Sequence, residues 1–351
     1  MRQVSWTRRE FLYGAFIQWV ALTYGASFLQ GCVRRQEPTE TFIAKIKDYE
    51  ADIASSIITG LRELSIKSAE IKGKKILLKP NLIESKIGAL HVTTHPLVIR
   101  GAAEAFLKLG AKQVVIGEAS GHSRDSLRVI EEVGLIDVLS EDRIPFVDLN
   151  SDDVYTIPSL GHFSKLKTFS LPATLYGVDW IVSMPKMKTH HWAGFTLSMK
   201  NLFGILPGII YGWPKNVLHY AGIDECILDI NATVKPHFAI VDGIVGMEGD
   251  GPIMGTPRYT GVIVMGRNFP AVDATCVRVM GYDPRKVSYL RRASEFLGPI
   301  DESYINQHGE TVKSVLTKFS LEEKIPAHRK IYMNDPWSAV KEYITLLLQP
   351  K

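Results

Sequence analysis

Lysine, histidine and amide side chains that could hold an anion recur just after the apolar runs of this sequence. They are Lys79, Asn81, His95, Lys186, Lys188, Lys200 and Asn201. Lysine ammonium groups are compact charges that pair with phosphate or carboxylate, and amide groups add neutral hydrogen bonds. His95 stands before Pro96, where a predicted helix would point its positive end at the same place. We predict that these residues bind a small anionic ligand, although any one lysine taken alone could be a solvated surface charge.

Three carboxylates form a second candidate group. Asp242 directly follows an apolar run, and Glu248 and Asp250 lie in the glycine-rich stretch after it. Carboxylate oxygens separated by glycines suit Mg²⁺ or Ca²⁺, although the spacing is not that of an EF-hand. A divalent metal is therefore one candidate cofactor. Contact with a polar ligand and a glycine turn without any ligand are the alternatives.

Histidines supply the candidate proton carrier. Because adjacent side chains point in different directions on regular backbone, at most one of His190 and His191 is expected to serve the site, and we choose His190. Asp242 or Glu248 would then act as the base or as a metal ligand. The sequence contains no G-x-S-x-G, H-E-x-x-H, Walker or G-x-G-x-x-G motif, which disfavours serine hydrolases, zincins and ordinary Rossmann dehydrogenases.

Apolar runs and helical stretches alternate along most of the chain. Strands are predicted at 75–79, 113–117, 179–183, 237–241 and 261–265, and helices at 96–109, 123–132, 219–234 and 270–280. This alternation predicts an α/β fold with a mostly parallel twisted sheet and helices on both faces. Ligands of such sheets bind outside the carboxyl ends of the strands, where the candidate residues are expected to meet.

We predict four segments along the chain. Residues 1–32 are an export signal or anchor, 33–73 a tether with a helix over about 42–65, 74–284 the α/β core, and 285–351 a helical extension whose last helix covers 337–348.

Five short motifs extend over the core. They are K-P-N at 79–81, T-H-P at 94–96, P-K-M-K-T-H at 185–190, K-N at 200–201 and D-G-I-x-x-x-E-G-x-G-P at 242–252. Together they resemble the domain of unknown function 362 family over residues 74–282. The resemblance implies the architecture and no particular reaction. Some members carry a ferredoxin-like module, but this chain has three cysteines, so no iron–sulfur cluster is expected.

The N-terminus is predicted to direct export. Its Thr7-Arg8-Arg9-Glu10-Phe11-Leu12 stretch resembles a twin-arginine signal, and residues 29–32 resemble a lipobox that would place a lipid on Cys32. The alternative is an uncleaved membrane helix, because residues 11–33 carry no charge and could span about 30 Å of bilayer. In both cases the body would be periplasmic or on the outer surface, tethered to the membrane.

Composition limits the partners. The chain has 351 residues, and 41 basic against 37 acidic side chains give a net charge of +4, too weak to predict nucleic-acid binding. Besides Cys32 there are only Cys226 and Cys276, which could form a disulfide or remain buried thiols.

The sequence leaves three functions open. The first is an exported enzyme that acts on a small anionic molecule. The alternative is a non-catalytic lipoprotein that holds an anion or a cofactor for a protein partner. A purely structural envelope protein is the third, and it would bind no ligand at these residues.

Overall fold

The computed structural model describes residues 36–84, 87–121 and 125–332. The chain divides into two units, Met1–Glu37 and Pro38–Lys351, and every helix and strand named below belongs to the second. The predicted signal with Cys32 and the predicted helix over 337–348 therefore lie outside the described residues. Within the described ranges, no helix is both long enough and apolar enough to cross a membrane.

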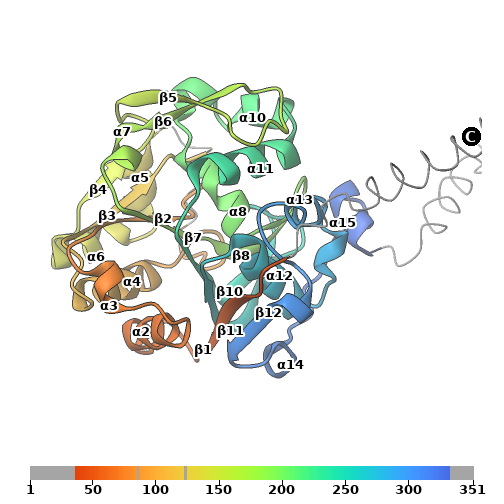
Figure 1. Cartoon of the computed structure of the whole chain (residues 1–351), viewed down its shortest axis with the longest axis horizontal. Helices are drawn as coiled ribbons and strands as arrows, with labels where there is room; N and C mark the ends of the chain where they lie inside the picture. Colours follow the sequence, from red (N-terminus) through yellow and green to blue (C-terminus); the bar gives the residue numbers. More distant parts are fainter. Residues whose placement is uncertain (1–35, 85–86, 122–124, 333–351) are drawn as a thin grey trace, which may run out of the picture. The chain divides into compact units, whose positions relative to one another are not determined.

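One large sheet organises the fold (Figure 1). Its main path runs β12 (Ile305–Gly309), β1 (Thr39–Lys45), β11 (Thr256–Gly266), β10 (Phe238–Glu248), β7 (Trp180–Met184), β2 (Lys75–Pro80), β3 (Gln113–Glu118) and β4 (Phe146–Asp148). In addition, β8 (Lys186–His190) pairs with β10, and β9 (Gly194–Thr196) pairs with β8. Most pairings are parallel; β1–β11, β10–β11 and β8–β9 are antiparallel. The predicted mostly parallel α/β fold is confirmed.

Helices cover both faces of the sheet, because successive residues of a strand point to opposite sides. In β2, Leu77 packs into one core and its neighbours Ile76 and Leu78 pack into the other. The core of Ile76 is covered by α2 (Ile53–Glu63), α4 (Pro96–Lys108), α5 (Ser126–Glu132) and α6 (Leu135–Asp142). The core of Leu77 is covered by α11 (Ile223–Val234), α12 (Phe269–Val279) and α13 (Ser288–Ala293).

Short elements complete the described chain. They are α3 (Ser68–Ile71), β5 (Val154–Pro158), β6 (Thr168–Pro172), α7 (Ala173–Tyr176), α8 (Ser198–Asn201), η1 (Leu202–Ile205), α9 (Gly208–Tyr211), α10 (Asn216–Tyr220), η2 (Pro284–Lys286), η3 (Glu302–Tyr304), α14 (Val312–Val315) and α15 (Pro326–Tyr332). Of these, α8 and η1 lie directly after β9 and carry candidate site residues.

The helix predicted over 42–65 is wrong in its first half. Residues 39–45 form β1, which lies between β11 and β12, and α2 begins only after Asp52 caps it by accepting a hydrogen bond from Ser55 N at 2.9 Å. The apolar spacing fits a helix by coincidence. Pairing with strands that lie more than 200 residues away in the sequence decides the conformation, and a local pattern cannot report such partners.

Two stretches outside the predicted strands also belong to the sheet. β10 continues past the predicted end at 241 to Glu248, with an irregularity between Gly243 and Val245, and residues 186–190 form β8 beside it. The glycines of this stretch do not prevent a strand, because β8 and β11 pair with it on its two sides. This extension determines where the predicted carboxylates lie.

The sheet draws on residues outside the predicted core of 74–284. β1 comes from the segment predicted as a tether and helix, and β12 comes from the segment predicted as a helical extension. Thr41 Oγ1 donates to Gln307 Oε1 at 2.8 Å across this pair of strands. Segments from before and after the predicted core thus form one edge of the sheet together.

Candidate functional site

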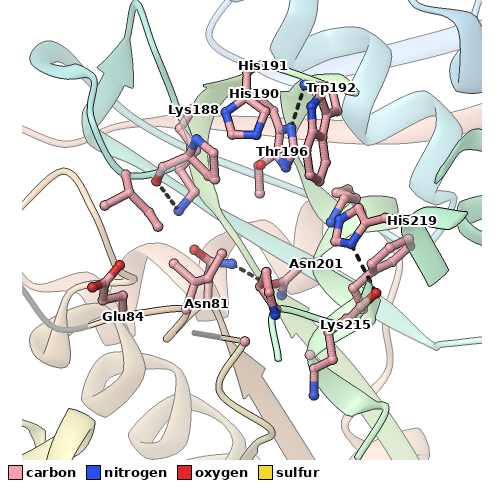
Figure 2. A pocket seen from close by; sticks show the side chains of 18 of the residues that line it. Asn81, Glu84, Lys188, His190, His191, Trp192, Thr196, Asn201, Lys215 and His219 are labelled. Atoms are coloured by element: carbon pink, nitrogen blue, oxygen red, sulfur yellow. Dashed lines mark hydrogen bonds between the residues drawn. The ribbon is translucent and has the colours of Figure 1, made fainter. Parts of the chain in front are cut away.

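A cavity of about 580 Å³ lies beyond the carboxyl ends of β2 and β3 (Figure 2). Its charged and imidazole side chains are Lys79, Lys188, Lys200, Lys215, His190, His191, His219, Glu84, Glu118 and Asp250. Figure 2 shows Lys188 and His190 on one side of the space, with Asn81 and Asn201 facing them from another. The volume is typical of sites for small molecules and cofactors.

A hydrogen-bonded ion pair forms the floor of the cavity. Lys79 Nζ lies 2.9 Å from Glu118 Oε2 and donates to Asn201 Oδ1 at 3.0 Å. Asn201 in turn donates from Nδ2 to the carbonyl of Lys79 and to Ser183 Oγ, both at 3.0 Å. Burial raises the pKa of Glu118, because removal from water penalises its charged form. This network joins β2, β3, β7 and α8 in one rigid base.

One amide oxygen in this floor is unsatisfied. Asn81 Nδ2 donates to Asn201 Oδ1 at 3.2 Å, but its own Oδ1 is buried and accepts no hydrogen bond from a described residue. Since Asn81 lines the cavity, this oxygen is available to a donor group of a ligand.

Lys188 is a buried amino group held by carbonyl groups. Its Nζ donates to the carbonyl oxygens of Val92 at 2.8 Å and Pro252 at 3.1 Å. Burial lowers its pKa well below the ordinary value, and the positive charges of Lys186 and Lys200 lower it further. No carboxylate of the described residues pairs with it.

Lys200 and Lys215 share this environment. Lys200 Nζ lies 3.7 Å from the ring centroid of Phe203, and Lys215 Nζ donates to Asn150 Oδ1 at 3.3 Å and to the carbonyl of Leu206. Burial lowers the pKa of both ammonium groups to about 7. Each therefore loses much of its charge near neutral pH while the cavity is empty of anions.

His190 is held as a neutral imidazole. Its Nδ1 accepts hydrogen bonds from the backbone N–H groups of Trp192 at 3.0 Å and Ala193 at 3.3 Å, so the hydrogen belongs on Nε2. Burial, followed by the charge of Lys200, lowers its pKa well below the usual value. His190 can donate a hydrogen bond to a ligand, but it is a poor source of a full proton.

The structure brings together seven of the predicted site residues in the cavity. They are Lys79, Asn81, Lys188, His190, Lys200, Asn201 and Asp250. Lys186 and Asp242 lie outside its lining, fully buried as an ion pair at 2.5 Å. His95 also lies elsewhere: its ring stacks on Tyr49 at 3.7 Å, and its backbone N–H donates to Asp242 Oδ2 at 3.0 Å.

The three carboxylates considered for a metal do not gather. Asp242 and Glu248 lie six residues apart on one extended strand, which separates them by roughly 20 Å along regular backbone. Glu248 Oε2 accepts from Ser320 N at 2.9 Å, and Asp250 lies 3.8 Å from His191. In the part of the chain that the structure describes, no three His, Cys, Asp or Glu side chains are placed to share a metal ion.

Comparison with known proteins identifies the core. The sequence model of the family described as "Domain of unknown function (DUF362)" matches residues 76–278, more than half of the chain. The protein belongs to the DUF362 family. Its K-P-N and K-N motifs supply Lys79, Asn81 and Asn201 to the cavity floor, whereas the D-G-I motif begins with the Asp242 that pairs with Lys186. The DUF362 motifs thus divide between the cavity and a buried structural cluster.

A curated relative and several solved chains, including the following two, are similar to this DUF362 chain. The relative, "Thylakoid-associated protein sll1697" of Synechocystis sp., is 28% identical over 264 residues, which cover 73% of this chain and 78% of the relative. A crystal structure of a Thermotoga maritima protein has 16% identity and a TM-score of 0.41, covering 66% of this chain and 59% of that one. The lactate racemase apoprotein of Thermoanaerobacterium thermosaccharolyticum has 16% identity and a TM-score of 0.42, covering 70% and 58%. The chain therefore spans about three fifths of these two solved chains.

Sequence reasoning missed several cavity residues. Glu118 is the last residue of β3 and Lys79 is the next-to-last residue of β2, and this place at the carboxyl end of a strand was a usable signal for both. Lys215 gave no such signal. It adopts a left-handed backbone conformation (φ 66°) between two short helices, and only the tertiary fold turns it inward.

Gly204 leaves the space that the Lys79–Glu118 pair occupies. A Cβ on Gly204 would lie 2.0 Å from Glu118 Oε1 and 2.4 Å from Lys79 Nζ, so we expect Gly204→Ala to force the pair apart and to lower the unfolding free energy by about 1–3 kcal/mol. Urea unfolding measures this. Gly177→Ala is the control, because its Cβ would meet nothing closer than 3.6 Å. Equal stability of the two variants would contradict the crowding argument.

Proposed function

We propose that the cavity binds a small anionic molecule and that the protein is an enzyme acting on it. One observation supports this most directly: three lysines, Lys188, Lys200 and Lys215, line a single cavity and form no ion pair with a described carboxylate. A buried ammonium group without a counterion is costly, which is why burial lowers these pKa values, and an entering anion would stabilise the charged form of all three lysines. Asn81 Oδ1 and the Nε2–H group of His190 add hydrogen-bonding groups that could orient the ligand.

Sulfate binding tests this proposal, because sulfate keeps the same charge over the whole working pH range. Titration calorimetry on the full chain should show saturable binding, and Lys188→Met should weaken it by about 2 kcal/mol or more, roughly 30-fold in Kd. Lys47→Met serves as the matched control, since the side chain of Lys47 is 91% exposed. Equal affinity of the two variants would remove Lys188 from the site, and absence of any sulfate binding would overturn the proposal.

Sulfate affinity should fall as the pH rises above 7. The pKa values of Lys200 and Lys215 are about 7 in the free protein, so both amines lose charge between pH 7 and 9. A bound anion favours the ammonium form, and binding must then take up protons. We expect Kd to increase by up to about tenfold per pH unit for each lysine that must be recharged. Calorimetry in buffers of different ionisation enthalpy measures the proton uptake directly; a Kd independent of pH would contradict it.

Catalysis and storage give different outcomes. A non-catalytic protein that holds an anion or cofactor for a partner would release its ligand chemically unchanged after incubation, whereas an enzyme would release a product. We place catalysis first because one cavity brings together the imidazole of His190 and the amines of Lys200 and Lys215, whose pKa values burial lowers to about 7, a combination suited to proton transfer near neutral pH.

We also propose that the protein is exported and tethered to a membrane through residues 1–33. The support is the twin-arginine-like motif, the uncharged stretch and Cys32, together with the name of the thylakoid-associated relative. Membrane fractionation of wild type and Cys32→Ser distinguishes the two anchors. Release of the Cys32→Ser protein into the soluble fraction supports lipidation, retention supports a membrane helix, and a wild-type protein found in the cytoplasm would contradict export.

A further inference from the structure

Lys200 differs from the other cavity lysines in its contacts. Lys79 is paired with Glu118, and Lys188 and Lys215 each donate to backbone carbonyls. Lys200 Nζ makes no hydrogen bond to any residue that the structure describes and lies only over the Phe203 ring. When the Lys200 amine is deprotonated, no described residue donates a hydrogen bond to its lone pair.

The backbone that carries Lys200 is firmly held. Ser198 N donates to Asp273 Oδ1 at 2.7 Å and Met199 N donates to Asp273 Oδ2 at 3.1 Å, which fixes the first turn of α8 to α12. The next residue, Asn201, is tied to Lys79 by the hydrogen bonds of the cavity floor. The amine is therefore presented to the cavity from a rigid support, as positioning for catalysis requires.

The surroundings of Lys200 favour the neutral amine. Burial is the largest cause of its lowered pKa, and the charge of Lys79, followed by that of Lys215, adds to it. Lysines that attack carbonyl groups are activated in this way, by an apolar pocket and a second cation. The Phe203 ring supplies an apolar surface, and Lys79 and Lys215 supply the cations.

We propose that Lys200 is a catalytic nucleophile that forms a Schiff base with a carbonyl compound bearing a carboxylate or phosphate group. This inference rests on the proposed function, since Lys188 and Lys215 would hold the anionic group of the same molecule. The substrate class is then a 2-oxo acid or a phosphorylated aldehyde or ketone of a size that 580 Å³ can enclose.

The steps balance without an oxidant or reductant. The lone pair of Lys200 Nζ attacks the carbonyl carbon, the C=O π pair moves to oxygen, and one proton passes from nitrogen to that oxygen to give a carbinolamine. The ammonium group of Lys215 then protonates the hydroxyl group, the C–O bond breaks with its electron pair, and water leaves. The nitrogen lone pair forms the C=N bond of a protonated imine. His190 Nε2–H hydrogen-bonds the carbonyl oxygen and so polarises it without giving up its proton.

Reductive trapping tests this proposal. The full chain is incubated with glyoxylate and cyanoborohydride, and the modified lysine is located by peptide mass mapping. We expect one rapidly formed secondary-amine adduct, at Lys200, with a rate that is greatest near pH 7, because attack requires the neutral Lys200 amine whereas binding of the anion requires the charged Lys215. Acetaldehyde is the neutral probe of similar size, and it should label Lys200 at least about tenfold more slowly. Sulfate should slow labelling by glyoxylate.

Matched variants distinguish labelling in the cavity from non-specific labelling of exposed lysines. Lys200→Met should abolish the rapid adduct, while its circular dichroism spectrum and thermal melting show that it is folded. Lys47, which is exposed, reports the background rate in every sample. A rapid adduct at Lys188 or Lys215 instead of Lys200, or labelling of Lys200 no faster than Lys47, would overturn the assignment. Sulfate binding without trapping would leave the anion site standing and reject the Schiff base; loss of both would reject the proposed function as well.

Discussion

Lys186→Met is expected to lower the unfolding free energy by about 3–5 kcal/mol, one of the two largest effects that we predict for this protein. Lys186 and Asp242 are both fully buried, and their charged atoms lie 2.5 Å apart. Removal of the lysine leaves the Asp242 carboxylate without its counterion, while the hydrogen bonds from His95 N and Ile244 N hold it in place. Urea unfolding followed by circular dichroism measures the loss.

A double variant separates charge from packing. Lys186→Met/Asp242→Asn removes the second charge but leaves one amide oxygen, which can accept from only one of the two backbone N–H groups, so it should recover part of the lost stability. Sulfate affinity should stay close to that of the wild type, because neither residue lines the cavity. If the single variant loses less than about 1 kcal/mol of unfolding free energy, Asp242 is not left as an unpaired buried carboxylate, and the argument is contradicted. A large fall in sulfate affinity would return Asp242 to the list of site residues.

Lys79→Met should destabilise the protein by a similar amount, about 3–5 kcal/mol near neutral pH, with a pH dependence that the first variant need not share. Glu118 remains buried in the cavity floor without its partner and becomes harder to ionise. Its folded-state pKa, already raised by burial, then rises further above the unfolded value of about 4.3. A group with a raised pKa binds protons more tightly when folded, so stability is retained below the unfolded pKa and lost as the pH rises above it.

The stability gap between wild type and Lys79→Met should therefore be smallest near pH 4 and widen toward pH 8. Lys79→Met/Glu118→Gln is the matched control, because it leaves no titrating carboxyl group at this place and its gap should stay flat. Urea unfolding at several pH values provides the measurement. A gap for the single variant that narrows as the pH rises would mean that Glu118 is not the group left uncompensated.

Local sequence patterns predicted only part of the site. Polar residues directly after an apolar strand were predictable, because the carboxyl ends of parallel strands meet at one edge of the sheet. Lys79 follows this logic, and it hydrogen-bonds Asn201, which comes from the end of α8. Lys186 and Asp242 follow the same pattern, yet they neutralise each other, because β8 and β10 place them side by side in the register.

The sequence by itself determined the α/β class and the membership in the DUF362 family. Both depend on information that is local along the chain: short runs of apolar residues, their alternation with helical stretches, and motifs of a few adjacent residues. The strands β2, β3 and β7 appear at the predicted positions for this reason, since each is buried on both faces whatever its neighbours are.

Only the tertiary structure decided which of these residues are free to bind a ligand. Residues 39–45 become a strand because β11 and β12 flank them, and Lys215 enters the cavity because the chain around it turns in a left-handed conformation. The tertiary structure also decides the role of each charged side chain. A lysine is a counterion, a structural donor or a reactive amine according to the groups within a few ångströms, and those groups come from distant parts of the chain. Lys186 meets Asp242, whereas Lys200 meets only an aromatic ring.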